Sequence, residues 1–528
     1  MESRDADVVI VGAGLSGLSA AYHLLKTDRT LRVLILEAKD RIGGRTLTSQ
    51  LQSADGNADF WDLGGEWVGR PQPHLQYLLN LFRLDTFNPA GPHGEALPYV
   101  PSMSFTARVD LFFFTKKLLR LKRRFHTCDI RASVEALQSD GITVEQYKDQ
   151  HLWTTGAKEV VDAACRCIFG LASSEMTLLY FLMYINSAGG LDVFTKPAEY
   201  AGRESRVKGG LLQLSTHLVQ MIGRKSILVK HPVTHIVQTG DYVTLVTSSR
   251  LQVRCQRTIL AIPPHHAGAI NYTPPLPSIK LNLLKSIPLA YIVKFIFTYE
   301  EAFWRGDTPH TDNSQYGFQT VLQDPEFGPA GIVYDATSAR GNPALVGFLT
   351  ASKAGPGEDY NDEDREEAIL DMLEAVLGPG VRNYIDSALK DWKKEPYNGG
   401  CFLKSLIPGT TKYFSSGFRD PYQKVHFAGT ESATVWCGFM NGAIQAGFRA
   451  STEVLRHLRP DMVKSADPDG IPVEGEGSTT HTRSNIVLLS TLIGVTTAIL
   501  IALSFKGTRY YLNPENFTLK LLPSRYQT

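Results

Sequence analysis

Residues 8–17 read VVIVGAGLSG, and this stretch decides the fold. It places Gly12, Gly14 and Gly17 in GxGxxG register, directly after an apolar run and at the start of the helical pattern LSGLSAAYHLLK. Such a turn lets the backbone approach a pyrophosphate at a helix N-terminus, where free N–H groups and the helix dipole favour anions. The stretch therefore predicts a strand over 8–11, a dinucleotide-binding turn and a helix.

An acidic residue follows at the spacing that this kind of site requires. The next apolar run reads LRVLILE over residues 31–37 and ends in Glu37, twenty residues after Gly17. A carboxylate at this place binds the ribose hydroxyls of a dinucleotide. GxGxxG alone is weak evidence, but strand, glycines, helix, strand and acid in this order make the prediction specific.

The same motif continues as EAKDRIGGRTLT over residues 37–48. Arg41, Gly43, Gly44 and Arg45 extend it beyond what NAD-dependent proteins usually show, and EAxDRxGGR resembles the FAD fingerprint of the amine oxidase and glutathione-reductase-like flavoproteins. The resemblance implies FAD as the cofactor. Arg45 could alternatively form a surface salt bridge, although the two glycines beside it suit a backbone that faces a phosphate.

The composition is that of a folded protein with more than one domain. The 528 residues are 43% hydrophobic and 20% charged, and the formal net charge is +1. No global field of either sign points to nucleic acid or to a cationic polymer as a partner. Six cysteines without paired CxxC spacing lead us to expect neither disulfides nor a metal site.

The two ends of the chain differ in kind. The N-terminus, MESRDADVVIVG, lacks a basic region followed by a long apolar segment, which predicts synthesis on cytosolic ribosomes. Near the C-terminus, residues 486–505 read IVLLSTLIGVTTAILIALSF and carry no charge. At about 1.5 Å per residue, this helix would cover the roughly 30 Å hydrocarbon core of a bilayer.

A buried core helix is the alternative for this apolar run. Arg483 and Lys506 flank it, however, and residues 460–484 have the composition of a linker. Only a short basic tail, 506–528, follows the run. We therefore expect a single C-terminal tail anchor, inserted after translation, with the rest of the chain in the cytosol.

The strand patterns predict a mixed α/β chain with α+β character. Apolar runs predict strands at Val8–Val11, Val33–Glu37, Ile227–Val237, Val243–Thr247, Arg257–Ala261 and Val293–Thr298. Helical stretches separate them, and nucleotide-type motifs stand at both ends. We expect two domains, each assembled from separate segments. They are a Rossmann-like, FAD/NAD(P)-type cofactor-binding domain (1–85, 208–290 and 390–458) and a substrate-binding domain (86–207 and 291–389).

Further segments carry a resemblance to one family. They read DLGGEWVG (62–69), AIPP (261–264), IPLAYIVKFIFTYEEAFWR (287–305), NGGCF (398–402) and FAGTESATVWCGFMNGAIQAGFRAS (427–451). In order and spacing they are similar to segments of the monoamine oxidases, tail-anchored flavoproteins of the mitochondrial outer membrane. The resemblance implies the flavoprotein amine oxidase fold, a location in that membrane with the catalytic body facing the cytosol, and leaves a homodimer open.

The same resemblance implies a reaction. Primary amines, with secondary amines left open, would be oxidatively deaminated with FAD to an imine and then an aldehyde, while O2 is reduced to H2O2. Cys401, after two glycines, stands where the family carries the cysteine bonded to the flavin 8α-methyl, an unreactive buried thiol being the alternative. The other residues implied to contact FAD are Val233, Trp392, Gly429, Thr430 and Met440.

Lys294 interrupts the apolar run IVKFIF, where a charged side chain is costly unless it is paired or functional. By resemblance it is the lysine that holds a water against flavin N5 and helps the reduced flavin meet oxygen. The alternative is a head group that reaches solvent while its stem stays buried.

Some positions depart from the family pattern. Phe402 and Phe439 stand where monoamine oxidases place two tyrosines face to face before the flavin. Two phenylalanine rings can still sandwich an amine, so we expect altered activity, with two ordinary core residues as the alternative. Arg203 takes the place of a glutamine that contacts the amine, and it could pair with an acidic group of the substrate or with Glu204.

Other functions stay open at this point. A polyamine or amino-acid oxidase would share the flavin fold, and Arg203 leaves room for an acidic substrate. A catalytically weak flavin-binding scaffold at a membrane is a reading from a different class, motivated by Phe402 and Phe439. A panel of amines and amino acids with detection of peroxide separates the three.

Overall fold

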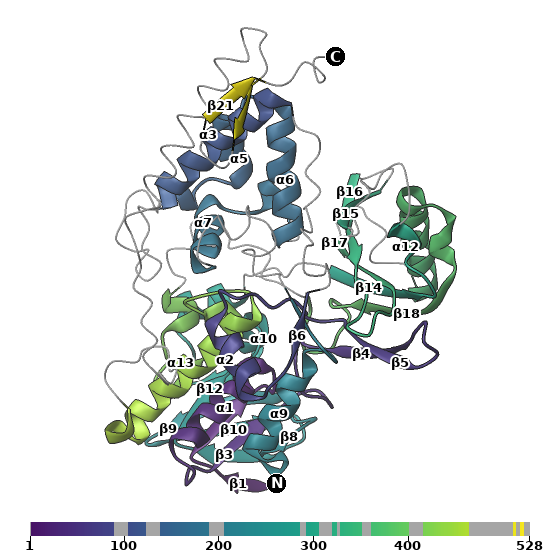
Figure 1. Cartoon of the computed structure of the whole chain (residues 1–528). Coiled ribbons are helices and arrows are strands. Elements are labelled where there is room, and N and C mark those ends of the chain that lie inside the picture. Colours follow the sequence, from purple (N-terminus) through teal and green to yellow (C-terminus); the bar gives the residue numbers. More distant parts are fainter. Residues whose placement is uncertain are drawn as a thin grey trace. The chain divides into compact units, whose positions relative to one another are not determined.

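The structure is a computed structural model. It describes residues 2–88, 104–122, 138–169, 171–188, 205–285, 292–305, 319–324, 328–350, 361–400, 415–463, 510–513 and 518–521. The chain divides into two compact units, Met1–Ile471 and Pro472–Thr528. In the second unit, β20 (Tyr510–Asn513) and β21 (Thr518–Leu521) pair antiparallel. All other elements belong to the first unit and are labelled in Figure 1.

A parallel sheet forms around the strand that precedes the glycine turn. Its order is β19–β12–β2–β3–β8, and every neighbouring pair is parallel. All residues of β2 are buried, which explains its continuous apolar sequence. The strands are β2 (Val8–Val11), β3 (Val33–Leu36), β8 (Ile227–Leu228), β12 (Arg257–Leu260) and β19 (Val425–Phe427).

Two helices that are far apart in the sequence pack together on this sheet (Figure 1). They are α1 (Leu15–Thr27) and α13 (Met440–Leu458). Gly447 allows their close approach, because a Cβ at that position would lie 2.3 Å from the carbonyl oxygen of Ser16. Helix α9 (Leu212–Ile222) packs against α1, and α2 (Pro73–Leu81) packs against α13.

A second sheet is mixed and has the order β1–β11–β10–β9–β13. Its two edge strands pair parallel with their neighbours and its inner pairs are antiparallel. The strands are β1 (Ser3–Asp5), β9 (Val233–Thr239), β10 (Tyr242–Thr247), β11 (Gln252–Cys255) and β13 (Asn271–Thr273). Helices α10 (Pro264–Ala269) and α11 (Ser278–Lys285) lie before and after β13 in the chain and pack on each other.

A third sheet is antiparallel, with the order β15–β16–β17–β14–β18. Strand β14 (Ile292–Tyr299), which lies between β17 and the edge strand β18, is buried on both faces. Val293, Phe295 and Phe297 pack with α12 (Asp362–Leu377), and Ile296 packs with residues of the hairpin β4 (Thr48–Gln52) and β5 (Ala58–Asp62). Since side chains alternate along a strand, Lys294 shares the face of Ile296. The strands are β14 (Ile292–Tyr299), β15 (Gln319–Asp324), β16 (Gly328–Asp335), β17 (Ala344–Thr350) and β18 (Tyr384–Asp391).

The described helices between β6 (Thr86–Phe87) and β7 (Arg206–Val207) share one apolar core with the second sheet. Helix α5 begins with a capping box between Thr143 and Gln146. Helix α7 is buried along most of its length, and Tyr180 and Tyr184 project from it into the core. The helices are α3 (Phe105–Lys122), α5 (Val144–His151), α6 (Thr155–Phe169) and α7 (Leu178–Ser187).

Most predicted strands are confirmed to within one or two residues, as is the mixed α/β class. The run Ile227–Val237 is wrong as one strand, because it forms β8 and the start of β9, which belong to different sheets. Lys230 between them adopts a φ of 61°, which ends the extended conformation. Pro232, which follows, has no N–H to donate to a ladder.

The predicted membrane segment lies outside the described residues. Among the residues that the structure describes, no helix is long and apolar enough to cross a membrane. The run 486–505 and all but the first four residues of the predicted linker, 460–484, fall in the remainder. The anchor and the boundaries of the two predicted domains stay predictions.

Candidate active site

The glycine turn after β2 has room for backbone only. Gly12 has a φ of +102°, and a Cβ there would lie 2.7 Å from the carbonyl oxygen of Ala261. A Cβ on Gly17 would lie 1.9 Å from the carbonyl oxygen of Gly12, so the first turn of α1 packs directly on the turn. Gly14 is the N-cap of α1 and has no side chain to occupy the first free N–H groups. The geometry of the turn is compatible with the anion site that the sequence predicts.

Glu37 lies beside this turn and is buried. Its Oε2 accepts a hydrogen bond from Ala13 N at 2.6 Å, and its Oε1 accepts one from Lys39 N at 2.9 Å. Two residues before Val233, His231 N donates to the carbonyl oxygen of Glu37 at 2.8 Å. The acid at the end of β3 is thus brought to the turn, as expected for a ribose-binding carboxylate.

The segment after Glu37 folds back onto the glycine turn. Gly43 N donates to Ala13 O at 2.9 Å, and Gly14 and Gly43 form an isolated parallel bridge. Gly44 faces the same turn, since a Cβ there would lie 3.3 Å from the Cα of Gly14. The paired glycines therefore line the turn from the opposite side.

Glu395 connects this segment to the chain that leads to Cys401. Its carboxylate accepts hydrogen bonds from Lys39 Nζ at 2.7 Å and Arg41 Nη2 at 2.6 Å, and it also pairs with Lys390. Burial raises the pKa of Glu395, but hydrogen bonds from these three cations outweigh burial and lower it to about 2. The sequence analysis missed this residue, because its partners Lys39 and Arg41 stand more than 350 positions away.

Arg45 makes an ion pair with the C-terminal loop. Its Nη1 lies 2.6 Å from Glu431 Oε1, and the Glu431 side chain is 3% exposed. The partner is a buried acid and not a surface residue. In the same loop, Gly429 N donates to Ser16 Oγ at 2.9 Å, and Thr430 Oγ1 donates to Phe439 O at 2.7 Å. The loop Gly429–Glu431 therefore closes on the start of α1.

Lys294 is the centre of a second cluster. Its side chain is 1% exposed, so the alternative that the head group reaches solvent is wrong. Nζ donates to Glu66 Oε2 at 2.9 Å and to Gly64 O at 3.1 Å, and it lies 5.0 Å from the ring centroid of Phe348. The other carboxylate oxygen of Glu66 accepts a hydrogen bond from the hydroxyl of Tyr334.

The loop 63–66 gathers two more of the predicted site residues. Trp392 is buried, and its Nε1 donates to Leu63 O at 3.0 Å. Met440 lies against Gly65, since a Cβ on that glycine would be 3.0 Å from its Sδ. Lys294 from β14, Trp392 after β18 and Met440 at the start of α13 therefore meet around one short loop.

Asp62 precedes this loop and is buried. It accepts hydrogen bonds from Thr48 Oγ1 at 2.6 Å and from Leu211 N at 3.1 Å. Burial raises its pKa to about 6, against the lowering effects of the Thr48 hydrogen bond and of Lys294. These hydrogen bonds connect the residue before the loop 63–66 to the Thr48 hydroxyl and to the backbone of Leu211.

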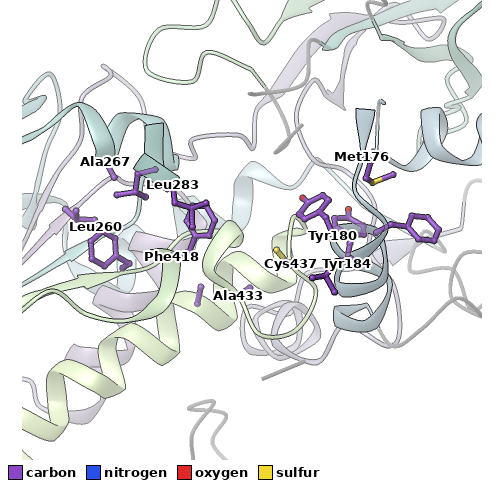
Figure 2. Packing of buried hydrophobic residues seen from close by; sticks show 14 of the residues in the cluster. Met176, Tyr180, Tyr184, Leu260, Ala267, Leu283, Phe418, Ala433 and Cys437 are labelled. Carbon is purple, nitrogen blue, oxygen red and sulfur yellow. The ribbon is translucent and has the colours of Figure 1, made fainter. Parts of the chain in front are cut away.

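Phe439, the residue before Met440, belongs to an aromatic group. Its ring centroid lies 5.5 Å from that of Tyr184 and 5.1 Å from that of Trp436, which it meets edge-on. Figure 2 shows Tyr180 and Tyr184 projecting from α7 toward Cys437. Burial raises the pKa of the Cys437 thiol to about 12, which disfavours the reactive thiolate form.

Three predicted site residues lie outside the described part of the chain: Arg203, Cys401 and Phe402. Of the other twelve, ten fall into two groups, and Phe439 lies in the aromatic group with Tyr184 and Trp436. Gly12, Gly14, Gly17, Glu37, Arg45, Gly429 and Thr430 surround the start of α1, while Lys294, Trp392 and Met440 surround the loop 63–66. Val233 starts β9, next to the segment that pairs with Glu37. Glu66 is the member of the second group that the sequence analysis missed.

These two groups combine a strand–turn–helix of the dinucleotide-binding type with a buried lysine beside the loop 63–66. The family described as flavin containing amine oxidoreductase matches residues 15–455, and the chain belongs to this family. The prediction of the family from its motifs is confirmed.

Known relatives agree over nearly the whole chain. The probable flavin-containing monoamine oxidase A of Dictyostelium discoideum is 32% identical over 465 residues, which are 86% of this chain and 98% of that protein. The flavin-containing amine oxidase B of Homo sapiens is 30% identical over 517 residues, 94% of this chain and 96% of that protein. The chain is therefore an enzyme of the amine oxidase type.

Solved structures show the same fold. Cyclohexylamine oxidase from Brevibacterium oxydans IH-35A superposes with a TM-score of 0.73 at 27% identity, covering 86% of this chain and 99% of its own. Wild-type putrescine oxidase bound to putrescine has a TM-score of 0.73 at 24% identity, with the same coverage. FAD-dependent oxidation of amines is thus the activity of this chain, as the sequence predicts.

Proposed function

We propose that this enzyme oxidises primary amines at the loop 63–66, with the flavin tethered through Cys401. The observation that carries the proposal is the convergence of Lys294, Trp392 and Met440 on that loop. These side chains come from three elements that are distant in the sequence, and the family resemblance assigns all three to the flavin.

The described residues fit FAD. The turn at Gly12–Gly14 is open to a pyrophosphate, because the facing Gly44 also lacks a side chain. Buried polar atoms nearby have no hydrogen-bond partner within the described residues, namely Glu431 Oε2 and Asn398 Nδ2. Such atoms are expected where a polar cofactor completes the site.

Each of these residues has a role toward the cofactor. The N-terminus of α1 would hold the pyrophosphate and Glu37 the ribose, while Trp392 and Met440 would pack near the ring system. Bound FAD supplies a two-electron acceptor for the amine and reduces O2 to H2O2. Lys294 would hold a water at the flavin with a remaining N–H, because an ammonium has three donors and two of them bind Glu66 and Gly64.

The aromatic group around Phe439 is the proposed substrate wall. Tyr184 and Trp436 hold the Phe439 ring, and an apolar wall favours an amine in its uncharged form. Phe402 would complete the wall, and Arg203 would set the preference for polar substrate groups. The substrate preference is tested by measuring peroxide release with a panel of compounds. The panel contains phenethylamine, tyramine, cyclohexylamine, putrescine and amino acids. If peroxide forms only with putrescine, or only with an amino acid, the substrate belongs to that class and not to the monoamines.

The tether is tested separately from the activity. Acid precipitation of the purified protein leaves covalent flavin in the pellet, and a Cys401→Ala variant should release it to the supernatant. If the wild type also releases its flavin to the supernatant, the proposed tether is wrong. The assignment as an amine oxidase would still stand. A yellow protein that forms no peroxide with any amine would instead favour a silent flavin-binding scaffold.

We further propose that residues 486–505 anchor the enzyme in the mitochondrial outer membrane, with the catalytic body in the cytosol. The support is the uncharged length of the run and the basic residues that flank it. A fluorescent fusion of residues 460–528 should coincide with mitochondria in cells. An endoplasmic-reticulum pattern would contradict the proposed membrane. Crosslinking of the full chain in detergent would show whether it forms a homodimer.

A further inference from the structure

The ion pair between Lys294 and Glu66 is the most buried cation–carboxylate pair of the described site, with side chains 1% and 3% exposed. A buried charge is costly unless it is paired and its remaining hydrogen-bonding groups are satisfied. Here both oxygens of Glu66 are used, one by Lys294 Nζ and the other by the hydroxyl of Tyr334. Each oxygen of the carboxylate therefore accepts a hydrogen bond from a neighbouring side chain.

The pair also fixes where the ammonium points. Lys294 projects from β14, and two acceptors from the loop 63–66, Glu66 Oε2 and Gly64 O, receive its hydrogen bonds. The loop in turn is held by Trp392 Nε1 on Leu63 O and by the hydrogen bonds to Asp62. A long, flexible side chain is thus restricted to one position by groups that are themselves restricted.

We propose that Glu66 is a positioning residue that holds the Lys294 ammonium at the flavin for the step in which oxygen is reduced. This inference rests on the proposed function. Two electrons and two protons pass to O2 in that step, and H2O2 leaves. A fixed positive charge stabilises the negative charge that develops on oxygen, and its effect depends on placement within about 1 Å.

A direct role for Glu66 in binding the substrate ammonium is the competing explanation. The geometry opposes it, because both carboxylate oxygens already have partners and Lys294 cancels the charge. The two explanations differ in the half-reaction that they affect. Loss of positioning slows the reaction with oxygen, whereas loss of a substrate contact slows reduction by the amine.

The test uses full-length, flavin-loaded Glu66→Gln, Lys294→Met and the double variant in stopped flow. Reduction by phenethylamine is followed without oxygen, and reoxidation is followed after mixing with O2. We expect Glu66→Gln to slow reoxidation about 10- to 100-fold while reduction changes less than about threefold. The double variant should be no slower than Lys294→Met, and Glu66→Asp should recover part of the rate.

Asp335→Asn is the matched control. It alters a buried carboxylate of the same sheet, Asp335 of β16, which pairs with the partly exposed Arg305 at 2.7 Å, whereas Lys294 binds Glu66 and Gly64. It should lower the melting temperature but leave reoxidation unchanged. Normal reoxidation in Glu66→Gln, an effect confined to reduction, or rate losses that multiply in the double variant would each overturn the inference.

Thermal unfolding supplies a readout that does not depend on turnover. If Glu66 and Lys294 act as a pair, the losses of melting temperature in the single variants should not add in the double variant. Additive losses would overturn the pairing. Failure of the proposed function looks different, because the wild type itself would then show no flavin reduction by any amine of the panel.

Discussion

The two halves of the site are built in different ways. Around the start of α1, most of the proposed contacts to the cofactor are made by backbone atoms, and Gly12, Gly14 and Gly17 stand within six residues of one another. Around the loop 63–66, the contacts are made by side chains, and the Lys294–Glu66 pair joins residues 228 positions apart. The first half follows from local chain geometry, and the second exists only once the third sheet, the β4–β5 hairpin and α13 have assembled.

The comparison shows which half tolerates change. A backbone site admits no side chain at its closest contacts, so substitution there should remove the cofactor altogether. A side-chain site can lose one group and keep its shape, so substitution there should change rate or stability by a measurable factor. The predictions below, in order of decreasing effect, test this difference.

Gly17→Ala should have the largest effect. Its Cβ would lie 1.9 Å from Gly12 O, which forces α1 away from β2. We expect loss of bound flavin together with destabilisation by about 3 kcal/mol or more, measured as the flavin-to-protein absorbance ratio and by thermal unfolding. Gly156→Ala is the control, because its Cβ would meet only Ala107 Cβ at 3.5 Å. Full flavin content in Gly17→Ala would contradict the claim that the backbone half of the site admits no side chain.

Lys294→Met should keep the flavin and lose rate. Methionine fills a similar volume, and the apolar face that Lys294 shares with Ile296 accepts it. We expect reoxidation by oxygen to slow about 100-fold, the size seen when a preorganised charge-stabilising donor is removed. Stopped-flow absorbance measures it, with flavin content as the control. Loss of flavin from this variant would mean that the two halves do not differ in the way described.

Glu395→Gln should reduce stability in a pH-dependent way. Its carboxylate holds Lys39 and Arg41, so we expect a loss of about 2 kcal/mol at neutral pH, since Arg41 and Lys390 are partly exposed and screened. The pKa of Glu395 is lowered to about 2 from 4.5, so its stabilisation is present above pH 4.5 and is lost as the pH falls toward 2. Denaturant unfolding of both proteins should therefore converge at low pH. A constant difference over this range would contradict the assignment.

Asp62→Asn should have the smallest effect and the opposite pH dependence. The pKa of Asp62 is raised to about 6 from 3.8, so the folded protein holds this proton more tightly than the unfolded chain does. Its contribution to stability is therefore largest at low pH and is lost as the pH rises from about 4 to about 6. Thermal unfolding should show the melting temperature of the wild type falling relative to that of the variant across this window. If the melting temperatures of the two proteins change in parallel with pH, burial does not raise the pKa of Asp62.

The sequence predicts the first half of the site well for a physical reason. The strand, turn, helix and acid that end in Glu37 are set by contacts between near neighbours, so their spacing in the chain reflects their geometry. Lys294 is also predictable, because a charge inside an apolar strand is costly without a function. Its partner is not, although Glu66 stands in the quoted segment DLGGEWVG. The pairing depends on which face of β14 carries Lys294. That face is settled only when β14 pairs with its antiparallel neighbours β17 and β18.

Long-range assembly explains the other misses too. Glu395 is an ordinary acid in the sequence until Lys39, Arg41 and Lys390 surround it. The break between β8 and β9 depends on the left-handed conformation of Lys230, which its residue type does not announce. Local patterns therefore predicted the fold class and the family, while the electrostatic contacts of the site had to be read from the structure.

The most direct test of the central claim is the absorbance spectrum of the purified full-length protein during anaerobic addition of phenethylamine. If the chain oxidises amines through FAD at the loop 63–66, the oxidised flavin spectrum should be present at the start and bleach on addition of the amine. It should then return on admission of air, more slowly in Lys294→Met than in the wild type. A flavin that stays oxidised with this amine and with every other member of the panel would contradict the account.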